Sequence, residues 1–403
     1  MPFERYFDHA ATTPPIPEVQ QFVAEHWERL YANANSIHSP GQRAGAEIER
    51  ARERVAALIG ADDPSEIVFT SGATESNNWV LSNFDEIFVS PFEHSSVREP
   101  ALSRGGIVLG GFAASPLPHP LSSATKSSVD EFGRAQERGD RTGALVSVMS
   151  VNNETGSRVD VPLDSYAGFH PETGGMGPGT PSPTLVGEGW GGGPGVPRPT
   201  KLHRDITQQV GKLPVDLTGV HYASFSAHKF GGLKGVGALY LRDGVTLEPL
   251  LRGGGQERGL RAGTLNVPGI IAMGIAAEVA MDRLDQRRLN VEDCRAAVLE
   301  HVETYLARPA PTGSPYILSL TFDDFEAQAL VTVLDRMGFA VSSGAACSAA
   351  STETSPVLLA MGYPESQARA TIRVSFGWSS EVEQSEALGK AIVRALDEVG
   401  DLG

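Results

Sequence analysis

The sequence predicts an α/β fold with a mainly parallel sheet, followed by a smaller α+β domain. Over roughly the first two thirds of the chain, short apolar segments typical of strands alternate with segments of helical periodicity, and this alternation favours a parallel sheet. In the last third, helical patterns flank strand candidates instead. We expect a large domain over residues 15–283 and a small domain formed by residues 1–14 and 284–403.

The elements of the large domain can be placed in order. A helical pattern over residues 48–59 ends at Gly60, which supplies a C-terminal stop. A long apolar helix is expected over residues 267–281, with Asn266 as its cap, and it is too short to span a bilayer. The expected strands are residues 67–70, 144–149 and 235–241.

The small domain is expected to mix both element types. Its predicted helices are residues 291–306, 325–337 and 388–399, and its predicted strands are residues 316–322 and 372–376.

The stretch from residue 168 to residue 199 fits neither pattern, because it consists mostly of Gly, Pro, Ser and Thr. Such a composition buries too little apolar surface to offset the entropy lost on ordering. We therefore expect a disordered insert in the large domain. A lid over a functional site, or a shifted reading frame in the sequence, are the alternatives.

Charge and cysteine content exclude several classes of function. The chain has 33 Lys and Arg against 49 Asp and Glu, a formal net charge of −16, which argues against binding to nucleic acid or to an anionic membrane. Two cysteines cannot form a disulfide framework, and charged residues interrupt the N-terminus where an export signal needs an apolar stretch. We expect a cytoplasmic protein.

Two segments have residues suited to a phosphorylated carbonyl cofactor. Lys229 follows Ser226 and His228 and precedes two glycines, and a lysine amine in such a setting can form a Schiff base; a solvated surface lysine is the alternative. Residues 71–74 follow a strand candidate. Their backbone amides and the Thr74 hydroxyl suit a phosphate group, although a simple helix cap is equally consistent with the motif.

Asp205 and His94 are further candidates. A carboxylate such as Asp205 can keep a pyridine nitrogen protonated and strengthen the ring as an electron sink, whereas the alternative is an exposed turn residue. His94 could stack on a ring or move protons, or serve only in structure.

The two cysteines have contrasting surroundings. Cys347 lies among small residues in the segment 342–351, as expected of an accessible segment that carries a nucleophilic thiol; an inert thiol in a tight turn is the alternative. Cys294 shares a helical face with Val291 and Val298, so we expect it in the core.

Taken in order, these motifs resemble the cysteine desulfurases, pyridoxal 5'-phosphate (PLP) enzymes of the aminotransferase class V group that supply sulfur for iron–sulfur clusters and tRNA thiolation. The resemblance implies a PLP-dependent transferase-like fold for the large domain. It is poor over residues 104–140 and 165–202. The matching segments are residues 8–14, 70–78, 93–95, 152–156, 205–212, 224–229, 253–264, 342–351 and 373–376.

The resemblance implies a role for each candidate around the cofactor. Lys229 should bind PLP covalently, Asp205 should pair with the pyridine nitrogen, and Gln208 should bond the ring hydroxyl. His94 should stack on the ring and assist proton transfer. The remaining residues of the cofactor site should be Ala73, Thr74, Asn153, Ser226, His228 and Thr264. Of these, Thr264 should reach the phosphate of the cofactor in the other subunit.

The substrate implied by the resemblance is L-cysteine, held by Asn153 and by Arg373, whose guanidinium suits a carboxylate. Cys347 should attack the substrate sulfur and become a persulfide, with L-alanine as product. The long segment after Cys347 resembles the subgroup with an extended cysteine loop, which can pass sulfur to a partner such as an iron–sulfur scaffold. A homodimer with shared sites is implied. We expect no metal site, and the acidic charge argues against a membrane or nucleic-acid partner.

Two other functions stay open at this point. One is a related lyase on the same scaffold that acts on selenocysteine or cysteine sulfinate. The other is a catalytically impaired relative that serves as a binding scaffold.

Overall fold

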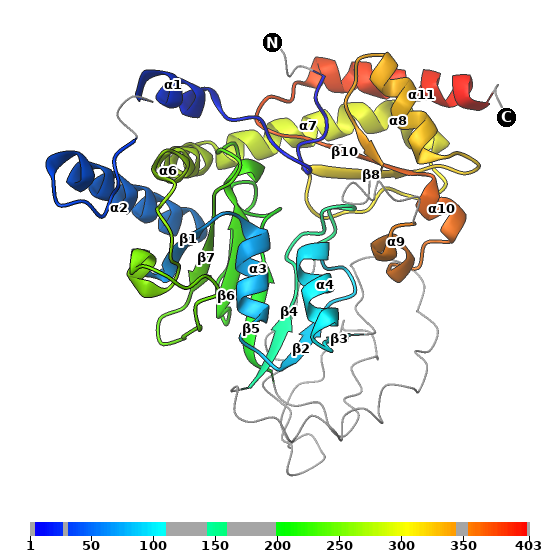
Figure 1. Cartoon of the computed structure of the whole chain (residues 1–403). Coiled ribbons are helices and arrows are strands. Elements are labelled where there is room, and N and C mark those ends of the chain that lie inside the picture. The colour runs from blue at the N-terminus through cyan, green and yellow to red at the C-terminus, as the bar shows by residue number, and fades with distance from the viewer. Residues whose placement is uncertain (1–4, 27–30, 110–142, 159–198, 344–353, 401–403) are drawn as a thin grey trace, which may run out of the picture.

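The computed structural model describes residues 5–26, 31–109, 143–158, 199–343 and 354–400 (Figure 1). Residues 168–198 of the Gly- and Pro-rich segment lie outside the described residues, so the disorder expected for this segment stays a prediction. Cys347 also lies outside them.

A seven-stranded sheet forms the centre of the part of the chain that is predicted to be the large domain, in the order β1-β7-β6-β5-β4-β2-β3. The strands from β6 to β3 are parallel to their neighbours, whereas β7 is antiparallel to both β6 and β1. The prediction of a mainly parallel sheet is therefore confirmed. In chain order the strands are β1 Ile67–Thr70, β2 Glu86–Val89, β3 Ile107–Val108, β4 Ala144–Ser147, β5 Pro199–Asp205, β6 Tyr222–Ser226 and β7 Gly237–Leu241.

Helices cover both faces of this sheet, and each face has its own apolar core. Since successive strand residues point to opposite faces, Phe69 packs in the core shared with α2 and α6, whereas Val68 packs in the core shared with α3 and α4. The helices are α1 Pro17–His26, α2 Ser39–Ile59, α3 Ala73–Leu81, α4 Ser95–Ser103 and α6 Val267–Asp282.

The ends of α2 and α6 follow from their sequences. Gly60 ends α2 with a φ of 72°, a left-handed conformation that glycine adopts without a steric penalty. The Asn266 side chain accepts a hydrogen bond from the amide of Gly269 at 3.1 Å and so caps α6. The helix stops that the sequence predicts are therefore present in the structure.

A second, antiparallel sheet in the order β8-β10-β9 lies beside the first, with α7, α8 and α11 packed on it (Figure 1). Phe7 from the N-terminal segment is buried in the core of this unit. The elements of this unit are α7 Leu284–Val302, β8 Ile317–Thr321, α8 Ala327–Arg336, β9 Ser342–Ser343, β10 Thr371–Ser375 and α11 Val382–Gly400. Between β9 and β10 lie α9 Pro356–Ala360 and α10 Glu365–Arg369, whose buried residues Val357, Leu358 and Ala368 belong to the core that Phe69 shares with α2 and α6. The division into domains at residue 284 stays a prediction.

Element boundaries differ from the predictions where apolar periodicity is absent. Helix α7 begins at Leu284 rather than near residue 291. The apolar pattern does not indicate its first turns because their residues are exposed or half-buried. It ends at Val302, and a short 3-10 helix, Glu303–Tyr305, completes the predicted segment. The strand predicted over residues 144–149 ends at Ser147. Further 3-10 helices among the described residues are Pro64–Glu66, η4 Ala227–Lys229 and Gln256–Gly259.

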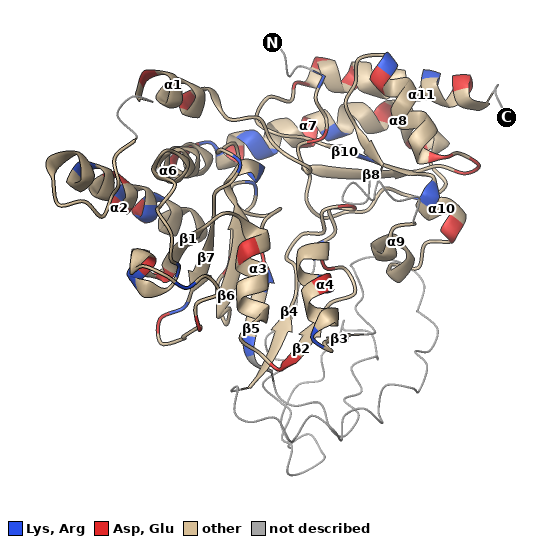
Figure 2. Ribbon diagram, in the orientation of Figure 1, with Lys and Arg blue, Asp and Glu red and all other residues tan. Residues whose placement is uncertain are grey.

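Charged residues lie mainly on the outer helices, where both signs are interspersed, while β4, β6 and β7 carry none (Figure 2). No helix within the described ranges is long and apolar enough to cross a membrane.

Candidate active site

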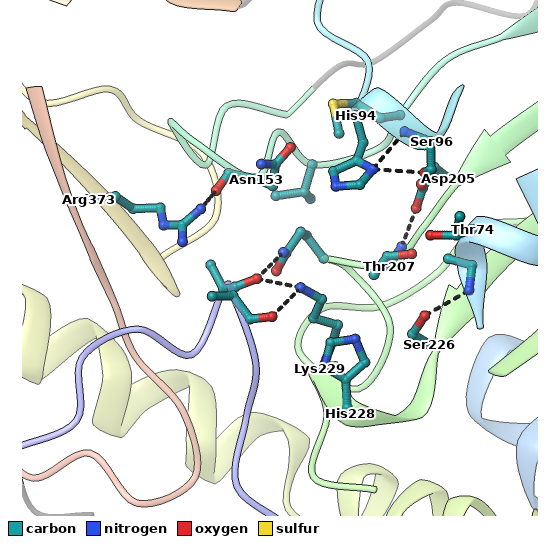
Figure 3. A pocket seen from close by; sticks show the side chains of 16 residues that line it. Thr74, His94, Ser96, Asn153, Asp205, Thr207, Ser226, His228, Lys229 and Arg373 are labelled. Carbon is teal, nitrogen blue, oxygen red and sulfur yellow. Dashed lines mark hydrogen bonds between the residues drawn. The ribbon is translucent and has the colours of Figure 1, made fainter. Parts of the chain in front are cut away.

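A pocket of about 320 Å³ lies at the carboxyl ends of β4, β5 and β6, along one edge of the central sheet. Ligands bind beyond the carboxyl ends of parallel strands in open α/β sheets, and the chain places its chemical groups there. Ten of the residues predicted for the site line this pocket: Ala73, Thr74, His94, Asn153, Asp205, Gln208, Ser226, His228, Lys229 and Arg373. Figure 3 shows Lys229 between Arg373 on one side and Thr74 and Ser226 on the other.

The Asp205 carboxylate is buried and held in place by two donors. It ends β5, where the amide of Thr207 donates to Oδ1 at 3.0 Å and Asn77 Nδ2 donates to Oδ2 at 2.9 Å. The exposed turn that was the alternative for Asp205 is wrong, because only 5% of the residue is exposed. A fixed buried carboxylate at this position can pair with a cationic nitrogen.

His203, two residues before Asp205 on β5, links this strand to its two neighbours, β4 and β6. Its ring is fully buried between two hydroxyl groups, with Nδ1 2.8 Å from Ser147 Oγ and Nε2 2.9 Å from Ser224 Oγ. Burial lowers the pKa of His203 to about 4, so the ring is neutral at pH 7. The hydroxyls of two neighbouring strands therefore make a buried histidine tolerable in the middle of the sheet.

The N-terminus of α3 forms one end of the pocket. Gly72 caps the helix without a side-chain hydrogen bond, and the amide of Ala73 donates to Ser226 Oγ at 2.8 Å. A Cβ added to Gly72 would lie 3.2 Å from that Oγ, so glycine keeps the turn close to β6. Helix amides and hydroxyl groups arranged in this way favour a bound anion.

Lys229 lies at the end of η4, directly after β6. Its Nζ donates to the carbonyl oxygens of Ala10 at 2.6 Å and Ala11 at 2.8 Å. Next to it, His228 Nδ1 lies 3.0 Å from Thr12 Oγ1, and burial followed by the charge of Lys229 lowers the pKa of His228 to about 3. The N-terminal segment thus holds the lysine amine at the pocket.

His94 caps α4, and its ring borders the pocket (Figure 3). Nδ1 accepts a hydrogen bond from the amide of Ser96 at 3.1 Å, so the proton of the neutral ring is on Nε2. Asn77 Nδ2 donates to Ser96 Oγ at 2.9 Å and also to Asp205. The sequence reasoning missed the roles of Asn77 and Ser96, although Asn77 lies within the matching segment 70–78.

Arg373 reaches the pocket from the second sheet. It is 1% exposed, and its Nη1 donates to the carbonyl of Asn153 at 2.8 Å while Nη2 pairs with Asp8 Oδ1 at 2.8 Å. Its Nε is buried without a hydrogen-bond partner among the described residues. A guanidinium with a donor left over can bind a carboxylate.

Glu93 and Glu154, beside the pocket residues His94 and Asn153, are buried acids. Burial raises the pKa of Glu93 to about 8 and that of Glu154 to about 7. The Ser355 hydroxyl, which caps α9, donates to Glu154. No role was predicted for either glutamate, and only their place next to His94 and Asn153 could have drawn attention to them.

Two predicted site residues are not among those that line the pocket, and only one of them, Thr264, lies in the described part of the chain. Thr264 is exposed on the loop before α6 and does not line it, so its predicted contact with the other subunit stays a prediction. Cys347 lies outside the described residues. Within the described ranges, no group of three or more His, Cys, Asp or Glu could hold a metal ion.

Comparison with known proteins gives one consistent result. The family model "Aminotransferase class-V" matches residues 5–163 and 199–388. A cysteine desulfurase of Sinorhizobium fredii is 36% identical over 419 residues, a match that covers 98% of this chain and 97% of that protein. An IscS-like cysteine desulfurase of Mycobacterium tuberculosis is 33% identical, with 97% and 96% covered.

Solved structures agree with this result. The structure of a NifS-like protein superposes with a TM-score of 0.76 at 31% identity, covering 98% of this chain and all of that one. A structure described as SspA in complex with cysteine has a TM-score of 0.68 at 26% identity, with 94% and 100% covered.

Proposed function

The chain belongs to the aminotransferase class V family, and from this premise we propose that it is a PLP-dependent cysteine desulfurase. The family match confirms the resemblance that the sequence motifs predict. One observation carries the proposal: Lys229, the Asp205 carboxylate, the N-terminus of α3 and Arg373 border one pocket of about 320 Å³.

The groups around the pocket fit PLP. The buried Asp205 carboxylate suits a protonated pyridine nitrogen, and the amides at the start of α3 with Ser226 suit a phosphate. The Lys229 amine suits the aldehyde. A side chain at Gly72 would crowd this anion site.

When bound, PLP supplies an electron sink that weakens the Cβ–S bond of L-cysteine. Arg373 holds the carboxylate of L-cysteine and so fixes its orientation. Lys229 Nζ moves the protons that leave and return to the substrate carbons. His94, whose ring borders the same pocket, is the second group that can move a proton there.

The Cys347 thiolate attacks the substrate sulfur. The new S–S bond forms as the Cβ–S bond breaks, and the electron pair of the broken bond stays with the substrate, which takes up protons and leaves as L-alanine. The protein is left with a persulfide on Cys347. We propose that this sulfur passes to an acceptor protein, such as an iron–sulfur scaffold, in the cytoplasm.

We also propose a homodimer in which Thr264 reaches the phosphate of the other subunit's cofactor. The loop that presents Thr264 is exposed, and it lies near α3 because Arg261 pairs with Glu75 of that helix at 2.9 Å. Sedimentation of the purified protein, with and without PLP, tests this part of the proposal.

The decisive experiment is a visible spectrum of the purified protein, followed by borohydride reduction and peptide mapping. We expect the absorbance of lysine-bound PLP and a pyridoxyl group on Lys229. Absence of both, in protein supplied with PLP, would refute the PLP proposal and favour an impaired scaffold protein.

Product analysis tests the reaction itself. L-cysteine should give L-alanine and sulfide in equal amounts in the presence of a thiol. Cys347→Ser should stop this reaction and keep the PLP absorbance, whereas Cys294→Ser should preserve both. Turnover of selenocysteine or cysteine sulfinate without turnover of L-cysteine would favour the related lyases.

A further inference from the structure

Lys212 is a buried lysine directly behind the pocket. It is 4% exposed and follows Gly211 in the turn after β5, where Gly211 has a φ of 70°. Lys212 is absent from the lining of the large pocket but lines a smaller cavity of about 10 Å³, and Lys229 borders both. Lysine is almost never fully buried unless it is paired, so this position calls for an explanation.

The ammonium group of Lys212 donates to Gln208 Oε1 at 2.9 Å. Within the described ranges it forms no ion pair with a carboxylate. A buried cation without an acidic partner is costly, and an apolar side chain of similar volume would pack there at lower cost. The residue is therefore better explained by what it does for Gln208 than by a contribution to folding.

Gln208 is 4% exposed and does line the pocket. Its Nε2 donates to the carbonyl of Ala10 at 2.8 Å, the oxygen that also accepts a hydrogen bond from Lys229 Nζ. An ammonium group can only donate. While Lys212 is protonated, Oε1 must therefore face it, because a flipped amide would place its NH₂ group against an ammonium.

Three positively charged side chains, Lys229, Arg287 and Arg373, lie near Lys212 on different elements. Burial, followed by the charges of Lys229 and Arg373, lowers the pKa of Lys212 to about 7. The charge of Lys212 in turn contributes to the low pKa values of His9 and His228, each about 3 and each due mainly to burial. The titratable and charged groups that face it are His9, His228, Lys229, Arg287, Tyr316 and Arg373.

We propose that Lys212 is a positioning residue that fixes the Gln208 amide, so that Gln208 presents an N–H donor rather than an oxygen beside Lys229. The proposal rests on the proposed function, because a donor at this point is useful only to the oxygen of a bound ring. Lys212 also places a positive charge near Lys229, and a neighbouring cation disfavours protonation of an amine.

The test compares Lys212→Met, Lys212→Arg, Gln208→Leu and the double variant Lys212→Met/Gln208→Leu with the wild-type protein. The readouts are the dissociation constant of PLP for the apo-protein, the pH midpoint of the visible absorbance, and the melting temperature of the apo-protein. Lys390→Met is the matched control, because Lys390 is half-exposed on α11.

Lys212→Met should weaken PLP binding about tenfold, the value of one aligned hydrogen bond. It should also raise the pH midpoint by about one unit, because both the cation and the fixed donor are lost. The apo-protein should melt near the wild-type temperature. Lys212→Arg, which keeps the charge and the donors, should restore most of the affinity, and Lys390→Met should match the wild type.

The double variant decides whether Lys212 acts through Gln208. We expect it to bind PLP no more weakly than Gln208→Leu alone, whereas an additive loss would overturn the proposal. So would an unchanged PLP affinity and midpoint in Lys212→Met, or a loss confined to melting temperature. Lys212→Gln replaces the Met variant if that protein does not fold.

Failure of the proposed function is distinguishable from failure of this inference. If the wild-type protein itself shows no lysine-bound PLP, the function is wrong. If the wild-type protein binds PLP and the variants at position 212 behave like Lys390→Met, only the role of Lys212 is wrong.

Discussion

Arg52 of α2 and Glu257 of the loop before α6 form a two-point ion pair inside the protein. Both pairs of atoms, Nη1 with Oε2 and Nη2 with Oε1, are 2.8 Å apart, and the side chains are 3% and 1% exposed. Arg52 Nη1 also donates to the carbonyl of Ile67, while Glu257 Oε2 accepts from the amide of Phe69. The pair therefore joins α2, β1 and a distant loop.

This ion pair holds a loop of unusual backbone conformation. Glu257 and Arg258 have φ values of 47° and 58°, which are uncommon for residues other than glycine and persist only where the surroundings enforce them. The same loop continues to Arg261, which pairs with Glu75 of α3, and then to Thr264. The anchor at Glu257 thus helps to determine how the loop lies against the N-terminal end of α3.

Arg52→Met should lower the free energy of unfolding by about 3–5 kcal/mol, because it leaves the Glu257 carboxylate buried without its cation. Urea denaturation measures this loss. Arg54→Met is the matched control on the same helix: its pair with Glu278 is exposed, and such pairs contribute less than about 1 kcal/mol. Equal losses in the two variants would contradict the role given to the buried pair.

Glu154 should make the protein less stable as the pH rises. Its folded pKa of about 7 lies above the ordinary 4.5 because the carboxyl is buried. Between these values the unfolded state has released a proton that the folded state keeps, so this contribution is full below pH 4.5 and is lost as the pH rises through 7. At about 1.4 kcal/mol per pKa unit, the contribution is at most roughly 3 kcal/mol.

Urea denaturation of the wild-type protein and Glu154→Gln between pH 4.5 and pH 8.5 tests this expectation. The free-energy difference, wild type minus variant, should fall across the range. Ser355→Ala removes a hydrogen bond that lowers the pKa of Glu154, so it should shift the fall to higher pH. A difference that stays constant with pH would show that Glu154 does not take up a proton on folding.

Much of the fold could be predicted because its elements have local signals. The run Ile67–Thr70 is apolar and rich in β-branched residues, and it is strand β1. Gly60 ends α2 in a left-handed conformation, and the Asn266 side chain caps the start of α6, as the sequence predicts. Strands and helices of this kind are specified by neighbours a few residues apart, so periodicity is enough to find them.

Strand β5 could not be found in this way. Between Lys201 and Asp205 it has only Leu202 as an aliphatic residue. Its central His203 can be buried because its two ring nitrogens form hydrogen bonds with hydroxyl groups on β4 and β6. Those hydroxyls lie at Ser147 and Ser224, far away in the sequence. The partners of Lys212 and of Arg52 likewise become visible only when the chain is folded.

Asp205→Asn should weaken PLP binding at least tenfold, because an amide has no negative charge to pair with a cationic ring nitrogen. Reconstitution of the apo-protein with PLP measures the affinity. Asp216→Asn is a close control. Asp216 Oδ1 accepts a hydrogen bond from the amide of Thr218, just as Asp205 Oδ1 accepts one from the amide of Thr207. Unlike Asp205, however, Asp216 is exposed. Unchanged PLP affinity in Asp205→Asn would remove this carboxylate from the cofactor site.

Cys294 should stay unreactive in the folded protein. Its side chain lies in the core with Val291 and Val298, as the helical pattern predicts, and it is 0% exposed. Burial raises the pKa of the Cys294 thiol, so little thiolate, the reactive form, is present near neutral pH. Iodoacetamide should therefore modify Cys294 only after urea is added, and mass spectrometry after incubation with L-cysteine should place the persulfide on Cys347. A persulfide on Cys294 in the native Cys347→Ser variant would contradict this assignment, because sulfur would then have reached a thiol that the core excludes from substrate.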